Sequence, residues 1–195
     1  MYHFYTQTFF QIRGVLGFWG FVVSVGGGRM GGELLGAVLN AHQMILKEWN
    51  HELVLFTGAF QKELWELYLK ANQDGNSQIT IHGFDKNNYK ETLSSASAII
   101  CLGGYNSLIE AVSTRKPVLV YKRKFYGANK EQDLRSTLFQ QSGLINVISS
   151  EDFEPERLSR LILDTVFNFK LPAMSLNFEG GRKSIIYLVE ASMKY

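Results

Sequence analysis

From position 21 onward, short apolar runs rich in β-branched residues alternate with longer amphipathic stretches. The first run, Phe21–Val25, is almost continuously apolar, which is typical of a strand buried on both faces of a sheet. Later runs of the same kind predict five more strands, at 52–56, 78–82, 98–102, 117–121 and 145–148. Most of these runs stop at or near a glycine.

The stretches between the runs carry apolar residues at helical spacing. The first predicted helix spans 33–49, and its periodic apolar positions are Leu34, Leu35, Val38, Leu39, Met44 and Ile45. Further helices are predicted at 61–72, 86–94, 107–113 and 129–141, from Pro155 onward, and after Gly180. Gly143 suits the position that follows a helix, and Pro155 suits a first turn, where its missing N–H costs nothing.

Six strands alternating with helices predict an α/β fold. Its core is a doubly wound, mostly parallel, six-stranded Rossmann-type sheet with helices on both faces. The strand order expected for this class is 3-2-1-4-5-6. Residues 1–20 fit no strand–helix unit, so we interpret them as a lead-in, a linker or a partner-facing segment. Residues 21–195 are interpreted as one domain.

Composition excludes several other classes of protein. The formal net charge of +2 is too small to indicate nucleic-acid binding. A single cysteine, Cys101, excludes an intramolecular disulfide and favours a reducing cytoplasm. No apolar run reaches the roughly 18–20 residues of a membrane helix, and no Cys/His pair has zinc spacing. We therefore expect a cytoplasmic protein without a metal site.

A glycine-rich loop, Ser24–Glu33, joins the first strand to the first helix. At such a junction the backbone of Gly26, Gly27 and Gly28 could approach a phosphate, and Arg29 could add a charge-assisted contact. The loop fits G-x-G-x-x-G but lacks the acidic residue that would close the next strand in a dinucleotide site. We favour phosphate binding, and a tight turn without a ligand stays open as the alternative.

A second glycine loop follows the fourth strand. It contains Gly103, Gly104 and Ser107, which could receive a phosphate by the same physics. Glu110 lies three residues after Ser107 on the next helix, so its carboxylate could accept hydrogen bonds from a vicinal diol such as a ribose.

The segment GGYNS…EA…KPVLV, followed by Glu131-Gln132 and Arg135, resembles the C-terminal half of GT-B glycosyltransferases. The most similar members are related to the lipid II-forming N-acetylglucosaminyltransferase or are bacterial glycosyltransferases with a GGYN loop. The resemblance runs from about Gly20 to the last predicted helix. It implies binding of a nucleotide-sugar, with a UDP-sugar favoured, as substrate rather than cofactor.

The resemblance also implies roles for individual residues. Gly26, Gly27 and Gly28 would face the diphosphate, and Glu110 would bind the ribose. Gln132, with Glu131, would bind hydroxyls of the donor hexose, where the lipid II enzyme has two glutamines. Backbone groups of the segment His82–Phe84 would lie beside the base. The phosphate–sugar region would be lined by Gly103, Gly104, Asn106 and Ser107.

In this family the acceptor, and usually the catalytic base, belong to an N-terminal domain. The resemblance therefore implies a partner half, either a domain or a separate subunit, and an acceptor that is often lipid-linked, which leaves membrane association open. The implied chemistry is metal-independent, with helix dipoles stabilising the leaving diphosphate. Two alternatives remain: a UDP-sugar epimerase or hydrolase-like domain, and a non-catalytic nucleotide-binding module.

The histidines and the cysteine receive structural interpretations. His42 and His51 are predicted to lie at the surface, and His82 to end a strand in a structural role near the base site. Cys101 is predicted to be buried core. A basic cluster around the fifth strand is interpreted as a solvated rim, with attraction for a diphosphate or an anionic lipid surface as the alternative; it comprises Lys116, Lys122, Arg123 and Lys124.

Overall fold

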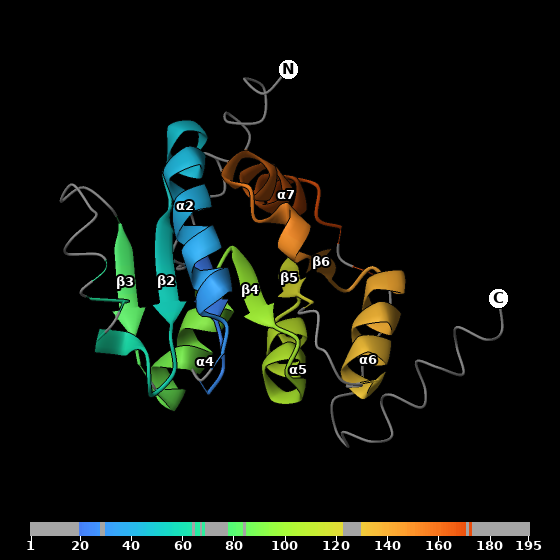
Figure 1. Ribbon diagram of the computed structural model, residues 1–195. Helices are drawn as coiled ribbons and strands as arrows, with labels where there is room; N and C mark the ends of the chain where they lie inside the picture. Colours follow the sequence, from blue (N-terminus) through green and yellow to red (C-terminus); the bar gives the residue numbers. More distant parts are fainter. Residues whose placement is uncertain are drawn as a thin grey trace, which may run out of the picture.

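The computed structural model contains a six-stranded parallel sheet in the order β3-β2-β1-β4-β5-β6 (Figure 1). The structure describes residues 20–27, 30–63, 65–66, 68, 78–83, 85–122, 130–170 and 172, except for the side chains of 130–133. The strands are β1 (Gly20–Ser24), β2 (Glu52–Phe56), β3 (Ile79–His82), β4 (Ala98–Leu102), β5 (Val118–Tyr121) and β6 (Asn146–Ile148). The predicted strand order is confirmed.

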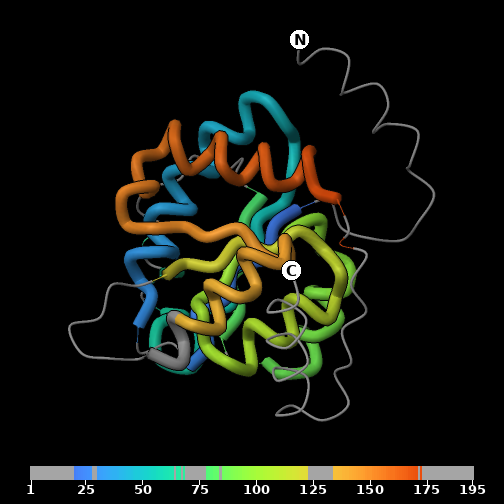
Figure 2. Tube along the Cα trace, turned by 90° about the vertical axis from the view of Figure 1, so that its right-hand side faces the viewer, coloured from blue at the N-terminus to red at the C-terminus, as the bar shows by residue number. Residues whose placement is uncertain are grey.

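Helices cover both faces of the sheet. They are α2 (Gly32–Glu48), α4 (Lys86–Ser95), α5 (Tyr105–Ser113), α6 (Lys130–Gln141) and α7 (Pro155–Phe167), with a 3-10 turn η3 (Ser150–Asp152). Side chains of α2 and α7 join one buried cluster with Phe21, Val23 and Ile100 of the strands. Side chains of α4, α5 and α6 join the other cluster with Val22 and Ile99. Two separate cores on opposite faces confirm the doubly wound architecture (Figures 1 and 2).

The alternation of the cores follows from strand geometry. Successive side chains of a strand point to opposite faces, so Phe21 and Val23 enter one core while Val22 enters the other. All five residues of β1 are buried, as expected for a central parallel strand. The continuous apolar run therefore identifies β1 correctly, although β1 begins one residue earlier than predicted.

The remaining boundaries agree closely with the sequence pattern. Helix α5 begins at Tyr105, two residues before its predicted start. Gly143 has a φ of +70° just beyond α6, which is the left-handed conformation expected after a helix. Half of the predicted helix 61–72 lies outside the described residues, and its positions 62–63, 65–66 and 68 are helical. The predicted segments 1–19 and 173–195 lie outside the described residues.

Candidate functional site at the carboxyl edge of the sheet

The two glycine loops lie side by side because β1 and β4 are neighbours. Ser24 at the end of β1 pairs in register with Cys101 near the end of β4. The chain runs outward from β1 through β2 to β3, then returns to place β4 on the other side of β1. In α/β proteins, ligands bind at such a switch point, outside the carboxyl ends of the two central strands. We call the region between the two glycine loops the β1–β4 crevice.

The loops approach each other closely at one point. A Cβ atom added to Gly26 would stand 3.8 Å from the hydroxyl oxygen of Ser107. Gly26 has a φ of +66°, and its N–H donates to the Ser24 hydroxyl at 3.4 Å. The fold therefore brings the predicted residues Gly26 and Ser107 together. Gly28 and Arg29, which belong to the same prediction, lie outside the described residues.

The glycines of the two loops differ in backbone conformation and in the space around a side chain at each position. Gly26 and Gly31 have positive φ, and a Cβ on Gly31 would stand 2.7 Å from Val25 and 2.9 Å from Leu102. Gly27 and Gly104 have neither constraint, since a Cβ on either would meet nothing within 4 Å. Backbone conformation thus explains why positions 26 and 31 are glycine. Gly27 and Gly104 have no such explanation, and their bare backbone faces open space.

The two helices that begin at these loops lack side-chain caps. The N-cap of α2 is Gly31 and that of α5 is Gly104, and neither supplies a side-chain hydrogen bond. Two other described helices are capped by their own carboxylates: Asp85 accepts from Asn88 N–H in α4, and Glu154 accepts from Arg157 N–H in α7. No N-cap side chain therefore competes with an anion for the first turn of α2 or α5.

Glu110 interacts electrostatically with Tyr89, a partly buried residue of α4. The pKa of Tyr89 is raised to about 12, mainly by burial, and the charges of Cys101 and Glu110 add to that rise. The Ser24 hydroxyl acts in the opposite direction on the same phenol. Glu110 is thus near the Tyr89 hydroxyl and the end of β1, and its side chain is half-buried. The role of Glu110 in binding a ribose stays a prediction.

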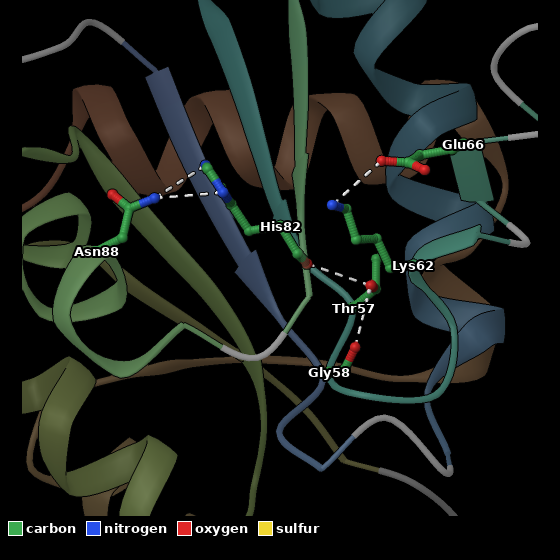
Figure 3. A network of polar contacts seen from close by, with 6 residues as sticks. All are labelled: Thr57, Gly58, Lys62, Glu66, His82 and Asn88. Atoms are coloured by element: carbon green, nitrogen blue, oxygen red, sulfur yellow. Dashed lines mark hydrogen bonds and ion pairs between the residues drawn. The ribbon is translucent and has the colours of Figure 1, made fainter.

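His82 is held in place on a neighbouring part of the same edge. Its ring stacks on Phe56, with ring centroids 5.1 Å apart and planes inclined by 22°. The amide nitrogen of Asn88 lies 3.2 Å from both ring nitrogens, and the Thr57 hydroxyl donates to the His82 carbonyl at 3.2 Å (Figure 3). These contacts agree with the structural role predicted for His82. Phe84, predicted to lie beside a base, is outside the described residues.

Helix α6 contacts the second glycine loop through an aromatic stack. The guanidinium carbon of Arg135 lies 4.6 Å from the ring centroid of Tyr105, and Arg135 is only 7% exposed. Tyr105 stands between Gly104 and Asn106, so α6 is tied directly to the loop. The side chains of Glu131 and Gln132 lie outside the described part of the chain. Asn106 is exposed and Gly103 is buried.

The prediction that His42 and His51 lie at the surface is wrong. Each is 1% exposed, and Nδ1 of His42 lies 2.8 Å from Nε2 of His51. His42 lies on the apolar face of α2, and His51 packs against Phe21 and Trp49. Burial lowers the pKa of both rings, that of His42 to about 4. This pair lies where β2 begins, at the edge of the sheet opposite the crevice.

Cys101 is fully buried, as predicted, and burial raises its pKa to about 12. In the described ranges, no three His, Cys, Asp or Glu side chains gather closely enough to hold a metal ion. The described helices also include none that is long and apolar enough to cross a membrane. The two described lysines of the predicted basic cluster do not lie together, because Lys116 precedes β5 and Lys122 follows it, at opposite edges of the sheet; both are half-buried. Arg123 and Lys124 lie outside the described residues.

Comparison with known proteins identifies the family. Residues 22–187 match the glycosyltransferase family 28 C-terminal domain. The chain is 24% identical over 184 residues to a protein of Clostridium botulinum (strain Alaska E43 / Type E3) named UDP-N-acetylglucosamine--N-acetylmuramyl-(pentapeptide) pyrophosphoryl-undecaprenol N-acetylglucosamine transferase. The match spans 89% of this chain and 46% of that relative, so the chain covers about half of the relative's length.

Two solved structures share the fold. Acinetobacter baumannii MurG matches with a TM-score of 0.65 at 16% identity, over 93% of this chain and 52% of that one. The solution structure of ALG13 matches with a TM-score of 0.59 at 14% identity, over 91% of this chain and 98% of that one. The resemblance inferred from the GGYN loop is confirmed: this chain belongs to the glycosyltransferase family 28 C-terminal domain family.

Proposed function

We propose that this chain is the donor-binding half of a GT-B glycosyltransferase. It binds a nucleotide-sugar, with a UDP-sugar favoured, for transfer of the hexosyl group to an acceptor held by another domain or subunit. The name of the Clostridium botulinum relative includes UDP-N-acetylglucosamine, which supports a UDP-sugar as donor. Family membership supports the reaction class, and the two glycine loops support the location of the donor.

The observation that carries the proposal is that the loop leading into α2 approaches the first turn of α5 at Gly26 and Ser107, and that both helices begin without a side-chain cap. Each helix start carries the positive end of a helix dipole and backbone N–H groups that point outward. A diphosphate bound there would contact the bare backbone at Gly27 and Gly104, where the fold leaves space. Glu110, beside the same crevice, would accept hydrogen bonds from the two ribose hydroxyls.

In the proposed reaction the bond between the sugar C1 and the diphosphate oxygen breaks, and a bond forms between C1 and the acceptor oxygen. The electron pair of the broken bond passes to the diphosphate, where the positive ends of α2 and α5 would stabilise the added charge. The proton of the acceptor hydroxyl passes to a base that we assign to the acceptor-binding half. Transfer by this chain alone is therefore expected to be very slow.

Exposed apolar side chains around the crevice support a partner at this edge. Met30 follows β1, Phe60 follows β2, Tyr105 follows β4, and Leu134 lies in the first half of α6; all four are exposed. Single exposed apolar residues are ordinary, but several around one site suit an interface. We propose that the acceptor-binding half docks on this edge. The match covers 98% of the ALG13 chain, which is consistent with a domain of this kind forming a chain by itself.

We further propose that the acceptor is lipid-linked and that the protein acts in the cytoplasm at a membrane surface. Support comes from the name of the Clostridium botulinum relative, which includes a pyrophosphoryl-undecaprenol group. Lys122, which follows β5 at the carboxyl edge of the sheet, is consistent with attraction to anionic headgroups.

Titration calorimetry tests donor binding. The full chain is titrated with UDP, UDP-N-acetylglucosamine, GDP-mannose and NAD, and we expect binding of the uridine nucleotides. Glu110→Ala should weaken that binding by roughly tenfold, because two hydrogen bonds to a carboxylate are lost. The matched control is Glu48→Ala, which removes an exposed carboxylate from the end of α2 farthest from the crevice and should leave binding unchanged.

Product analysis separates the proposed transfer from the alternatives. Addition of an acceptor-binding half, identified by co-purification, should give a sugar–acceptor product. Epimerisation or hydrolysis of the sugar nucleotide without any acceptor would instead identify an epimerase or hydrolase-like domain. Binding of NAD in preference to uridine nucleotides would overturn the proposal.

A further inference from the structure

In the first half of α6, the described side chains are those of Leu134 and Arg135, and Arg135 is the buried one of these two. Helix α6 is largely polar, and Leu134 is 61% exposed. Among the residues of α6 whose side chains are described, the buried ones are Arg135, Ser136 and Phe139. Phe139 belongs to the core beneath the second half of the helix. Within its described part, the first half of α6 is thus anchored through Arg135.

Arg135 contacts Tyr105, which follows Gly104 of the second glycine loop. Its guanidinium group lies over the ring of Tyr105 at 4.6 Å, and this buried cation is shielded from water. A cation–π contact is stronger when the cation is desolvated, and the planar guanidinium group stacks well on an aromatic face. Tyr105 is the first residue of α5, next to Gly104. Residues 105 and 135 are thirty positions apart, so the stack joins two segments that are distant in sequence.

The stack also sets the beginning of α6. Residues 131 and 132 precede Arg135 by about one helical turn, and positions three or four apart in a helix lie along the same side. When Arg135 is fixed on Tyr105, the rotation of α6 and its height above the loop are fixed at 131 and 132 as well. Those are the positions that the family resemblance associates with the donor hexose.

We propose that Arg135 is a positioning residue for donor sugar recognition. By stacking on Tyr105 it holds the sugar-binding start of α6 at a set distance from the loop that holds the diphosphate. Arg135 itself contacts neither sugar nor phosphate. The inference rests on the proposed function, because it concerns how the same donor site distinguishes a nucleotide-sugar from the nucleotide alone.

The quantity to measure is the sugar increment, defined as the Kd for UDP divided by the Kd for a UDP-sugar. Calorimetry with the full chain gives it for UDP-N-acetylglucosamine, UDP-glucose and UDP-galactose, and the sugar with the largest wild-type increment is used. Arg135→Met keeps an unbranched apolar side chain but removes the guanidinium cation. We expect it to lower the increment by roughly tenfold, with the Kd for UDP unchanged within a factor of about two.

Variants of the aromatic partner provide matched controls. Tyr105→Phe keeps the ring face and should keep the increment, whereas Tyr105→Leu removes it and should match Arg135→Met. The double variant should be no worse than either single variant, because both remove the same contact. Arg135→Lys restores a cation and should recover part of the increment. Circular dichroism checks that each variant is folded, and the Tyr105 pair decides the question if Arg135→Met does not fold.

Several results would overturn the inference. An unchanged increment in both Arg135→Met and Tyr105→Leu would show that the stack does not position the sugar site. Equal weakening of UDP and UDP-sugar would identify Arg135 as a phosphate ligand or a general structural residue. A wild-type increment of one for every sugar would also refute it while leaving nucleotide binding intact, whereas failure to bind any uridine nucleotide would refute the proposed function as well.

Discussion

Nδ1 of His42 lies 2.8 Å from Nε2 of His51, and Nδ1 of His51 lies 2.8 Å from the carbonyl oxygen of Trp49. The carbonyl can only accept, so His51 Nδ1 carries the proton and His51 Nε2 accepts from Nδ1–H of His42. His42 Nε2 is then a buried acceptor that makes no hydrogen bond in the described structure. Both rings are neutral in this arrangement. A proton added to His42 would introduce a buried charge and an N–H group without an acceptor.

This relationship predicts a loss of stability in mild acid. The pKa of His42 in the folded protein is about 4, below its ordinary value of 6.5, so the unfolded chain binds more protons between these two values. Stability should be complete above about pH 6.5 and fall as the pH decreases toward 4, by about 1.4 kcal/mol per pH unit for one proton. The burial-lowered pKa of His51 acts in the same direction. Urea denaturation at a series of pH values measures the free energy of unfolding.

His42→Asn is the matched variant for this prediction. The side-chain amide of asparagine can place a donor near the position of Nδ1 but does not titrate, so the dependence on pH should become shallower. Some stability is lost at neutral pH because a smaller side chain leaves a cavity. A wild-type free energy of unfolding that stays constant between neutral pH and about pH 5 would contradict the proposed linkage.

The burial of His42 could have been predicted from the helical periodicity of α2. Position 42 falls four residues after Val38 and three before Ile45, on the same buried stripe of α2. The helical periodicity therefore places His42 on the buried face, even though histidine is a polar residue. His51 had no such signal, because it precedes β2 outside any periodic element.

The sheet could be predicted because each buried parallel strand is a continuous apolar run, and its order follows from fold class. The location of the candidate site at the carboxyl edge could be predicted in the same way, because Gly26 and Gly103 both follow central strands. The stack of Arg135 on Tyr105 could not be predicted in this way. It depends on how a polar helix packs, and neither helical periodicity nor local spacing indicates a contact between residues so distant in sequence.

The two constraints on Gly31 predict a large cost for Gly31→Ala. Alanine would have to adopt a φ near +99°, and its Cβ would be 2.7 Å from the Val25 side chain. Backbone strain and overpacking together should lower the free energy of unfolding by roughly 2–4 kcal/mol. Gly27→Ala in the same loop should change it by less than about 0.5 kcal/mol, because its Cβ would meet nothing. Similar urea midpoints for the two variants would contradict this interpretation of the loop.

The burial of Cys101 predicts an unreactive thiol. Its pKa of about 12 leaves very little thiolate at neutral pH, and its side chain is inaccessible to solvent. An aromatic disulfide reagent should therefore modify Cys101 only at the rate of opening or unfolding, and the rate should rise steeply with urea. Because the sequence has a single cysteine, the colour change reports this site alone. Rapid modification of the native protein would show that β4 opens locally.

Gly104→Ser distinguishes a phosphate-binding helix start from an ordinary one. Gly104 has φ −62° and ψ 144°, which serine adopts easily, and its side chain would enter open space. Serine would cap α5 and restrict the unfolded chain, so we expect a gain in stability of roughly 0.5–1 kcal/mol. The same hydroxyl would occupy N–H groups that we assign to the diphosphate, so UDP affinity should fall by about tenfold.

The opposite signs of these two effects make Gly104→Ser informative. A substitution that merely damages the fold would lower both stability and affinity, and one remote from the ligand would change stability alone. Gly104→Ala adds similar bulk without a capping oxygen, so its loss of affinity measures the steric part, and the remainder reports competition for the helix start. Calorimetry with UDP and urea denaturation of both variants give the comparison. If Gly104→Ser is more stable and binds UDP as tightly as the wild type, the start of α5 is not where the diphosphate binds.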